Sequence, residues 1–368
     1  FKLKGPYADL ALQLGNTFSR IIAKENLADI ANKPIGSGPF KLKEYVPGNK
    51  AIVVRNPDYF EKGLPYLDEV HQIYIKEYAA QVSALKTGEI DIMYFAPPEI
   101  IPELKKDPNI EVKIVSAPSF QPLIMWVSTK PFKDVRVRQA LRYAVDRKAM
   151  MEAATGGLGS LGNDTPVSPS NPYYNKALPQ RRKDVAKAKK LLAEAGYPNG
   201  IDITLYTSTQ RPGLEPAAVV AQQTLAESGF RVKIESVEIA RLYKDIIPKP
   251  KTMATSHNNW FGRPTIDESL TPFYYTKSNW NYTGYSNPEV DKLLDKAKSH
   301  TDFASRKKLY DKVQEILYNE GPDVVPYFKN YVHLYISFFR VPFPLSCFKI
   351  CLWLLSIWGV QSSSLDFP

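Results

Sequence analysis

The sequence has few of the residues that form disulfides and metal sites. Its two cysteines, Cys347 and Cys351, both lie near the C-terminus, so no disulfide framework or thiolate metal site can form among the residues before them. The four histidines are scattered, without the spacing of metal ligands. We therefore expect neither a metal site nor a cofactor.

Long hydrophobic segments are also missing. The longest apolar run, 350–360, is too short to span a bilayer, and Lys349 prevents its extension. The chain begins at Phe1 and shows no signal peptide, so we expect a fragment whose N-terminal portion lies outside this sequence.

Motifs for catalysis are absent as well. There is no G-x-S-x-G nucleophile elbow, no P-loop and no H-E-x-x-H pair. The segment 157–162 fits the dinucleotide pattern G-x-G-x-x-G, but a predicted helix precedes it and prolines follow where a phosphate-binding helix should begin. We interpret it as a loop and expect no enzyme activity.

The net charge of +10 does not indicate a nucleic-acid partner, because the positive residues do not cluster. Their densest run, which begins at Arg181-Arg182-Lys183, leads into an amphipathic helix, and we interpret it as a solvated face. We expect no binding to nucleic acid.

Hydrophobic periodicity and turn residues predict a mixed α/β chain without internal repeats. A strand at 201–206, a helix at 215–227 and a strand at 230–237 form a predicted right-handed, parallel βαβ unit. A helix is predicted over 134–154, where Asp134 can cap its start. The other predicted strands are 1–4, 40–45, 51–55, 69–75, 89–94 and 123–128, and the other helices are 7–27, 79–87, 184–195, 289–299 (with a capping box at Ser286–Glu289) and 303–320.

Several segments, in one order along the chain, resemble a known family. Residues 36–42 (GSGPFKL) and 55–60 (RNPDYF) are similar to the signature GTGPFKL … RNPDYW of family 5 solute-binding proteins, the peptide-, nickel- and opine-type receptors of ABC importers. The resemblance covers about residues 1–328. The remaining matched segments are 65–70, 85–92, 131–141, 143–147, 188–198 and 285–291.

The resemblance implies a bilobal α/β fold of the periplasmic-binding-protein type II, with two lobes around a ligand cleft that closes by hinge motion. Residues 1–127 would be the later part of an incomplete first lobe, 128–327 the second lobe, and 328–368 a return to the first lobe that gives way to an aberrant hydrophobic tail. It also implies a monomer, either periplasmic or membrane-associated outside the cytoplasm, that delivers a small solute or short peptide to ABC permease subunits.

Ligand sites favour aromatic residues with a few placed polar groups, and Asn258, Trp260, Phe261 and Arg263 fit that description. In peptide-binding relatives the segment similar to this one reads Trp-x-x-Asp, and the Asp supplies a carboxylate for the peptide's ammonium group. Arg263 stands at that place here, which indicates an anionic solute, unless it points to solvent or pairs with Asp267. Further candidate ligand contacts are Tyr94, Phe95, Phe120, Gln121 and Asn281.

After about Tyr331 the family pattern stops, and the aromatic, leucine-rich residues that follow lack strand or helix periodicity. We interpret this tail as an out-of-frame or intron-derived translation rather than a membrane or partner-binding segment, and expect few packed contacts beyond Tyr331. Two other functions stay open: an enzyme that acts on a small solute, and a regulatory or peptide-chaperoning domain on the same fold.

Overall fold

The computed structural model describes residues 1–3, 5–15, 19, 21–30, 33–94, 96–249, 255–257 and 265–337. The chain divides into two compact units. Unit 1 consists of residues 1–12, 95–106 and 112–333, and unit 2 of residues 13–94, 107–111 and 334–368. The lobe boundaries implied by the resemblance, at residues 127 and 327, stay a prediction.

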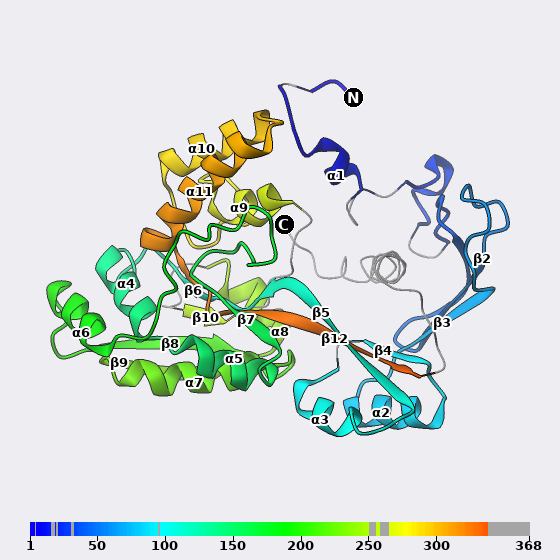
Figure 1. Ribbon diagram of the computed structural model, residues 1–368, viewed down its shortest axis with the longest axis horizontal. Helices are drawn as coiled ribbons and strands as arrows, with labels where there is room; N and C mark the ends of the chain where they lie inside the picture. Colours follow the sequence, from blue (N-terminus) through cyan, green and yellow to red (C-terminus); the bar gives the residue numbers. More distant parts are fainter. Residues whose placement is uncertain are drawn as a thin grey trace. The chain divides into compact units, whose positions relative to one another are not determined.

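A five-stranded sheet in the order β11–β6–β10–β8–β9 forms the centre of unit 1 (Figure 1). Strand β8 pairs in parallel with both β9 and β10, whereas β6 is antiparallel to β10 and β11. The ends of β8 and β10 and the start of β6 therefore share one edge of the sheet. The strands are β6 Leu123–Met125, β8 Ile201–Thr207, β9 Phe230–Ser236, β10 Thr255–His257 and β11 Asp323–Val324.

The predicted βαβ unit is confirmed, because α7 (Leu214–Ala226) connects the parallel strands β8 and β9 and lies along them (Figure 1). The predicted helix 134–154 is instead two helices, α4 (Val135–Ala144) and α5 (Arg147–Thr155). Val145 between them is extended, and the Asp146 carboxylate accepts a hydrogen bond from the Ala149 amide, which starts a new helix. With α6 (Val185–Glu194), these helices cover the apolar core of the sheet.

A second core lies between α9 (Ile266–Tyr274), α10 (Pro288–Ser299) and α11 (Phe303–Glu320), which group together in Figure 1. The predicted helices 289–299 and 303–320 are confirmed, but the expected capping box at Ser286–Glu289 is wrong. Asn287 caps α10 instead, because its side chain accepts hydrogen bonds from the amides of Glu289 and Val290.

Strand β12 (Tyr327–Ile336) pairs with β7 (Gly159–Leu161) and lies between β4 (Ile92–Tyr94) and β5 (Ile110–Phe120). The expectation of few packed contacts beyond Tyr331 is wrong for the end of β12. Val332, Leu334, Tyr335 and Ile336 are buried, because the strand continues its ladder past Tyr331. The rest of the expected tail, including both cysteines, lies outside the described residues.

The strands predicted at 40–45, 51–55 and 69–75 are confirmed as β1 (Phe40–Val46), β2 (Lys50–Arg55) and β3 (Glu69–Ile73), which pair as an antiparallel sheet in unit 2. The helix predicted over 7–27 is wrong: α1 covers Leu10–Leu14, and Ile22 forms a β-bridge with Gly36, so its backbone is extended. Residues 1–3 are not in a strand either. The remaining short elements of unit 2 are α2 Tyr78–Thr87 and a helical turn at Lys24–Asn26. Those of unit 1 are α3 Ile101–Leu104, α8 Ile239–Arg241 and helical turns at Pro98–Ile100 and Leu242–Ile246.

Candidate functional site

Gln121 connects three segments of unit 1 at the edge where β6 starts. It follows β5 directly, and its buried amide donates a hydrogen bond of 3.1 Å to the carbonyl oxygen of Pro212, in the loop after β8. Its amide oxygen accepts a hydrogen bond from the Tyr327 hydroxyl of β12. The loop after β8 and the start of β12 are therefore held at the end of β5.

A row of uncharged polar groups lies beside this connection. Alternation along β12 puts Tyr327, Lys329 and Tyr331 on one face of the strand. Tyr331 shares a side-chain hydrogen bond with Ser119 of β5. Burial raises the pKa of both Tyr327 and Tyr331, so both phenols stay neutral and neither supplies a negative charge to the lysine between them.

Lys329 is a partly buried lysine without an ion pair to any described residue. Burial and, to a smaller extent, the neighbouring positive charge of Arg211 together lower the pKa of its amine to about 8. Its partner in the antiparallel ladder is Gly159 of β7, so the position opposite Lys329 carries no side chain. A Cβ at Gly159 would overlap the backbone oxygen of Phe328.

Arg211 lies in the loop between β8 and α7, in the same segment as the Pro212 carbonyl that Gln121 holds. Its side chain is exposed, and within the described part of the chain no carboxylate forms an ion pair with it. Lys329 and Arg211 are close enough to repel each other, and the neutral phenols on either side of Lys329 do not balance this local excess of positive charge. Such a cluster suits an anionic group, since guanidinium and ammonium donate charge-assisted hydrogen bonds to carboxylates.

Strand β7 is laid along β12 by a continuous series of backbone hydrogen bonds. The ladder from Gly159 to Leu161 continues where the Gly162 amide donates to Pro326 (2.9 Å) and the Asp164 amide to Val325 (3.4 Å). The sequence predicted a loop here, which is wrong for 159–161. Glycine at positions 159 and 162 permits this close approach of the two backbones, because a side chain at Gly162 would overlap the Val325 carbonyl.

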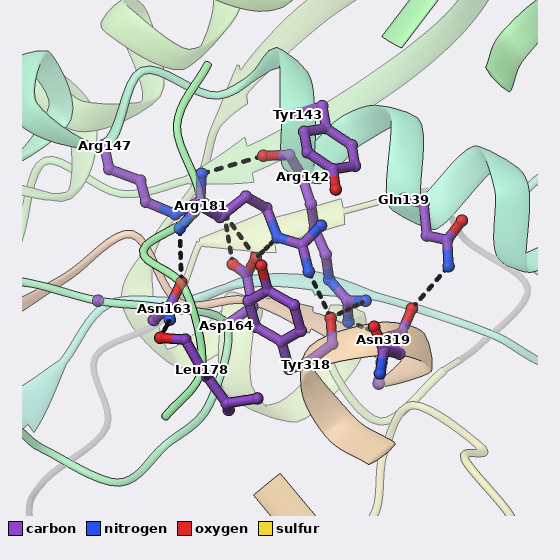
Figure 2. Close-up of polar contacts among 12 residues, drawn as sticks. Gln139, Arg142, Tyr143, Arg147, Asn163, Asp164, Leu178, Arg181, Tyr318 and Asn319 are labelled. Atoms are coloured by element: carbon purple, nitrogen blue, oxygen red, sulfur yellow. Dashed lines mark hydrogen bonds and ion pairs between the residues drawn. The ribbon is translucent and has the colours of Figure 1, made fainter. Parts of the chain in front are cut away.

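A buried ion cluster anchors the end of that segment (Figure 2). The Asp164 carboxylate oxygen forms ion pairs with a guanidinium nitrogen of Arg147 (2.6 Å) and one of Arg181 (2.8 Å). All three side chains are almost fully buried. Burial would raise the pKa of Asp164, but the nearby arginines outweigh this effect and hold it below its ordinary value. Arg181, expected on a solvated helix face, is instead stacked between the rings of Tyr143 and Tyr318, as Figure 2 shows.

The structure describes four of the nine predicted ligand contacts. Gln121 is buried in the connection above, and Phe120, on the opposite face of β5, packs against Phe328 with ring centroids 5.5 Å apart. Asn281 forms a turn, since its amide donates to the carbonyls of Tyr275 and Tyr285. Tyr94 is partly exposed in unit 2. Asn258, Trp260, Phe261, Arg263 and Phe95 lie outside the described residues.

Sequence reasoning missed Lys329 and Arg211. One signal was available for Lys329: a charged residue in a strand between Tyr327 and Tyr331, where buried residues are expected. Arg211 carried no signal, because its importance depends on its proximity to a lysine far along the chain.

Comparison with known proteins agrees with the resemblance seen in the sequence. Residues 1–322 match the family of bacterial extracellular solute-binding proteins, family 5 middle. Because this match covers most of the 368 residues, the chain belongs to that family. The members it matches are binding proteins, which agrees with the interpretation that the chain is not an enzyme.

Three relatives illustrate the similarity. The glutathione-binding protein GsiB of Escherichia coli is 28% identical over an aligned length of 335 residues, and the match covers 87% of this chain and 64% of that protein. DppA of Helicobacter pylori, solved with the peptide STSA, is 28% identical with a TM-score of 0.81 and covers 92% of this chain and 68% of its own. AgaA of A. tumefaciens, solved with agropinic acid, is 28% identical with a TM-score of 0.78 and covers 91% and 70%.

These likenesses confirm the expected fold class, the α/β fold of the periplasmic binding proteins. The chain spans 64% of the length of the curated relatives first matched. In the described part of the chain, no helix has both the length and the apolar character needed to cross a membrane. No group of three or more histidine, cysteine or acidic side chains among the described residues could hold a metal ion.

Proposed function

We propose that the chain is the solute-binding part of an ABC-importer receptor that works in the periplasm and delivers a small anionic solute to a membrane permease. Membership of the family supports the receptor role. The names of its relatives support the class of solute, since glutathione, a peptide and agropinic acid all carry carboxyl groups. A solute of peptide-like or opine-like size, captured by a monomer, fits this proposal.

The observation that carries the anionic specificity is the unbalanced charge at Lys329 and Arg211. A partly buried ammonium beside a guanidinium is unfavourable unless an anion joins them, because like charges repel strongly where water is scarce. A carboxylate between them would remove that repulsion and gain charge-assisted hydrogen bonds. The neutral phenols of Tyr327 and Tyr331 do not compete for this role.

Arg263 supports the same specificity from the sequence. It follows His257, the last residue of β10, and β10 ends opposite Leu123, close in sequence to Gln121. We propose that Arg263 contacts the anionic group, and that Trp260, Asn258 and Phe261 contact the body of the solute. An arginine in place of the family's aspartate would disfavour a peptide ammonium group.

Two blocked dipeptides test the charge preference by calorimetry. N-acetyl-Ala-Ala keeps the carboxylate and lacks the ammonium, whereas Ala-Ala-amide keeps the ammonium and lacks the carboxylate. We expect N-acetyl-Ala-Ala to bind more tightly, and Lys329→Met, Arg211→Gln and Arg263→Ala each to weaken its binding by about 1.4–2.8 kcal/mol, or about 10- to 100-fold. Lys233→Met is the control, because Lys233 is an exposed lysine paired with Glu235, and should leave the affinity unchanged.

Tighter binding of Ala-Ala-amide would contradict the proposal. So would an affinity for N-acetyl-Ala-Ala that survives both Lys329→Met and Arg211→Gln. An affinity that Arg263→Ala alone leaves unchanged would remove Arg263 from the site while leaving the other two residues in it.

A further inference from the structure

The N-terminal segment of unit 1, residues 1–12, places one buried side chain against the helices α10 and α11. Asp9 is 3% exposed, and it is the only buried residue among the described residues of this segment. Its carboxylate oxygen Oδ2 lies 2.6 Å from Nη2 of Arg306, near the start of α11. The neighbouring Ala8 amide donates a 2.9 Å hydrogen bond to the carbonyl oxygen of Lys298 in α10.

Arg306 lies among aromatic rings and is only 7% exposed. Its guanidinium carbon is 5.4 Å from the ring centre of Tyr173 and 5.6 Å from that of Tyr310, and the two ring centres are 5.3 Å apart. We call Arg306, Tyr173 and Tyr310 the arginine socket. A guanidinium buried in this way requires an anion, because a buried charge without a partner is strongly destabilising.

Asp9 fills the arginine socket incompletely. Nη2 of Arg306 donates to Asp9 and, at 3.4 Å, to the Tyr310 hydroxyl, but the buried Nε beside it has no hydrogen-bond partner among the described residues. The exposed pair of Arg231 and Asp202 shows the complete arrangement, in which Nε and Nη2 each donate to one carboxylate oxygen, at 2.7 and 3.0 Å. A carboxylate that is free to turn can make both bonds to Arg306, and such bidentate pairing is the stronger form.

The buried carboxylate of Asp267, near enough to interact with Arg306, is engaged elsewhere. It accepts a 2.6 Å hydrogen bond from the Thr271 hydroxyl and lies 3.9 Å from the ammonium group of Lys298. Within the described part of the chain, Asp9 therefore supplies the ion pair of Arg306.

We propose that the arginine socket is a binding site for small free carboxylates, which Asp9 occupies in their absence. A bound carboxylate takes Nε and Nη2 of Arg306 together and displaces Asp9, which releases residues 7–9 from α10 and α11. Because Asp9 is tethered, it competes at a high effective concentration, and displacement requires roughly millimolar carboxylate or more. The chain passes into unit 2 after Leu12, so the carboxylate frees the segment that leads there. The inference uses neither Lys329 nor Arg211 and does not rest on the proposed function.

Acetate is the probe for the site, with chloride at the same concentration as the reference. In chloride, Asp9→Ala should unfold at a lower urea concentration than the natural chain, because Arg306 loses its partner. Acetate should restore at least half of that shift. Asp202→Ala is the matched control, since it leaves Arg231 exposed to water, and acetate should not change its midpoint.

Arg306→Met in the Asp9→Ala background should abolish the response to acetate. This double variant should fold, because both charges are removed together. Acetate that acted at the proposed anion site would still stabilise it, so a response that persists in the double variant would overturn the inference. So would Asp9→Ala that acetate and chloride stabilise equally.

Hydrogen exchange of the natural chain tests the displacement of Asp9. Acetate should speed the exchange of peptides that cover residues 7–12 at least several-fold relative to chloride, because the Ala8 amide loses its bond to Lys298. Asp9→Ala gives the reference for a released segment and should exchange quickly in both salts. Exchange in the natural chain that stays the same up to the acetate concentration that restores Asp9→Ala would show that Asp9 is a permanent partner of Arg306 and would overturn the proposal.

Discussion

Asp323 is a buried carboxyl group whose proton should couple folding to pH. Its side chain accepts a 2.6 Å hydrogen bond from the Tyr274 hydroxyl. Burial raises its pKa to about 6, although Tyr274 and Arg142 act in the opposite direction. The folded state therefore binds this proton more tightly than the unfolded chain does. The stabilisation that this group provides is complete below its unfolded pKa and is lost as the pH rises through about 6.

Asp323→Asn should remove that pH dependence. The variant cannot ionise at this position. The free energy of unfolding of the variant, minus that of the natural chain, should therefore be roughly 1–3 kcal/mol larger at about pH 7.5 than at about pH 4. Urea unfolding at the two pH values measures the difference, and any constant cost of burying the new amide cancels from the comparison. A relative stability that is the same at both pH values, or that falls, would show that folding does not raise the pKa of Asp323.

Single residues also show what sequence alone could and could not provide at the candidate site. Gln121 was a candidate because it lies just before a predicted strand, and the structure places it where it connects Tyr327 to Pro212. Its contact with a solute stays a prediction. Lys329 and Arg211 were missed because a cation is significant only when its neighbours fail to balance it, and those neighbours come from other strands.

At the scale of elements, the segment from Gly159 to Asp164 joins the candidate site to the buried ion cluster. Asp164 compensates two buried guanidinium groups from different elements, Arg147 of α5 and Arg181 before α6. Its amide also continues the hydrogen bonds that hold β7 against β12. Loss of its charge should therefore destabilise the elements around it and also disturb the strand that carries Lys329.

Asp164→Asn should lower the free energy of unfolding by about 3–5 kcal/mol, because it leaves two buried arginines with one neutral partner. Asp202→Asn is the matched control: Asp202 also pairs with an arginine, Arg231, but both side chains are exposed. Urea denaturation of the two variants measures the contrast. Similar small losses in both would mean that backbone carbonyls alone can satisfy Arg147 and Arg181.

The elements that sequence patterns predicted well are those whose signals are local. The βαβ unit at 201–236 follows from β-branched strands, an apolar helix face and glycines at the turns. The break between α4 and α5 was missed because the apolar spacing continues through it, while a single capping interaction of Asp146 decides it. The helix expected over 7–27 failed for another reason, since pairing of Ile22 with Gly36 outweighs local helix propensity.

At the scale of the whole molecule, family segments in a fixed order were enough to predict the fold class and the family, and both are confirmed. The described residues of the proposed anion site lie directly after β5, in the loop after β8 and in β12, and all of them belong to unit 1. The stabilisation that a bound anion provides should therefore be detected first in this unit.

Ligand-dependent hydrogen exchange can test this at the level of the two units. At about a hundred times its dissociation constant, N-acetyl-Ala-Ala should stabilise the state that binds it by about 2.7 kcal/mol. Exchange measured through a urea titration should therefore show later unfolding for peptides from 201–236 of unit 1. Peptides from 40–73 of unit 2 should shift less, since no residue of the described anion site lies there. If the assignment to Lys329 and Arg211 is right, Lys329→Met should abolish the shift in 201–236. A larger shift in 40–73 than in 201–236 would instead place the anion in unit 2 and contradict that assignment.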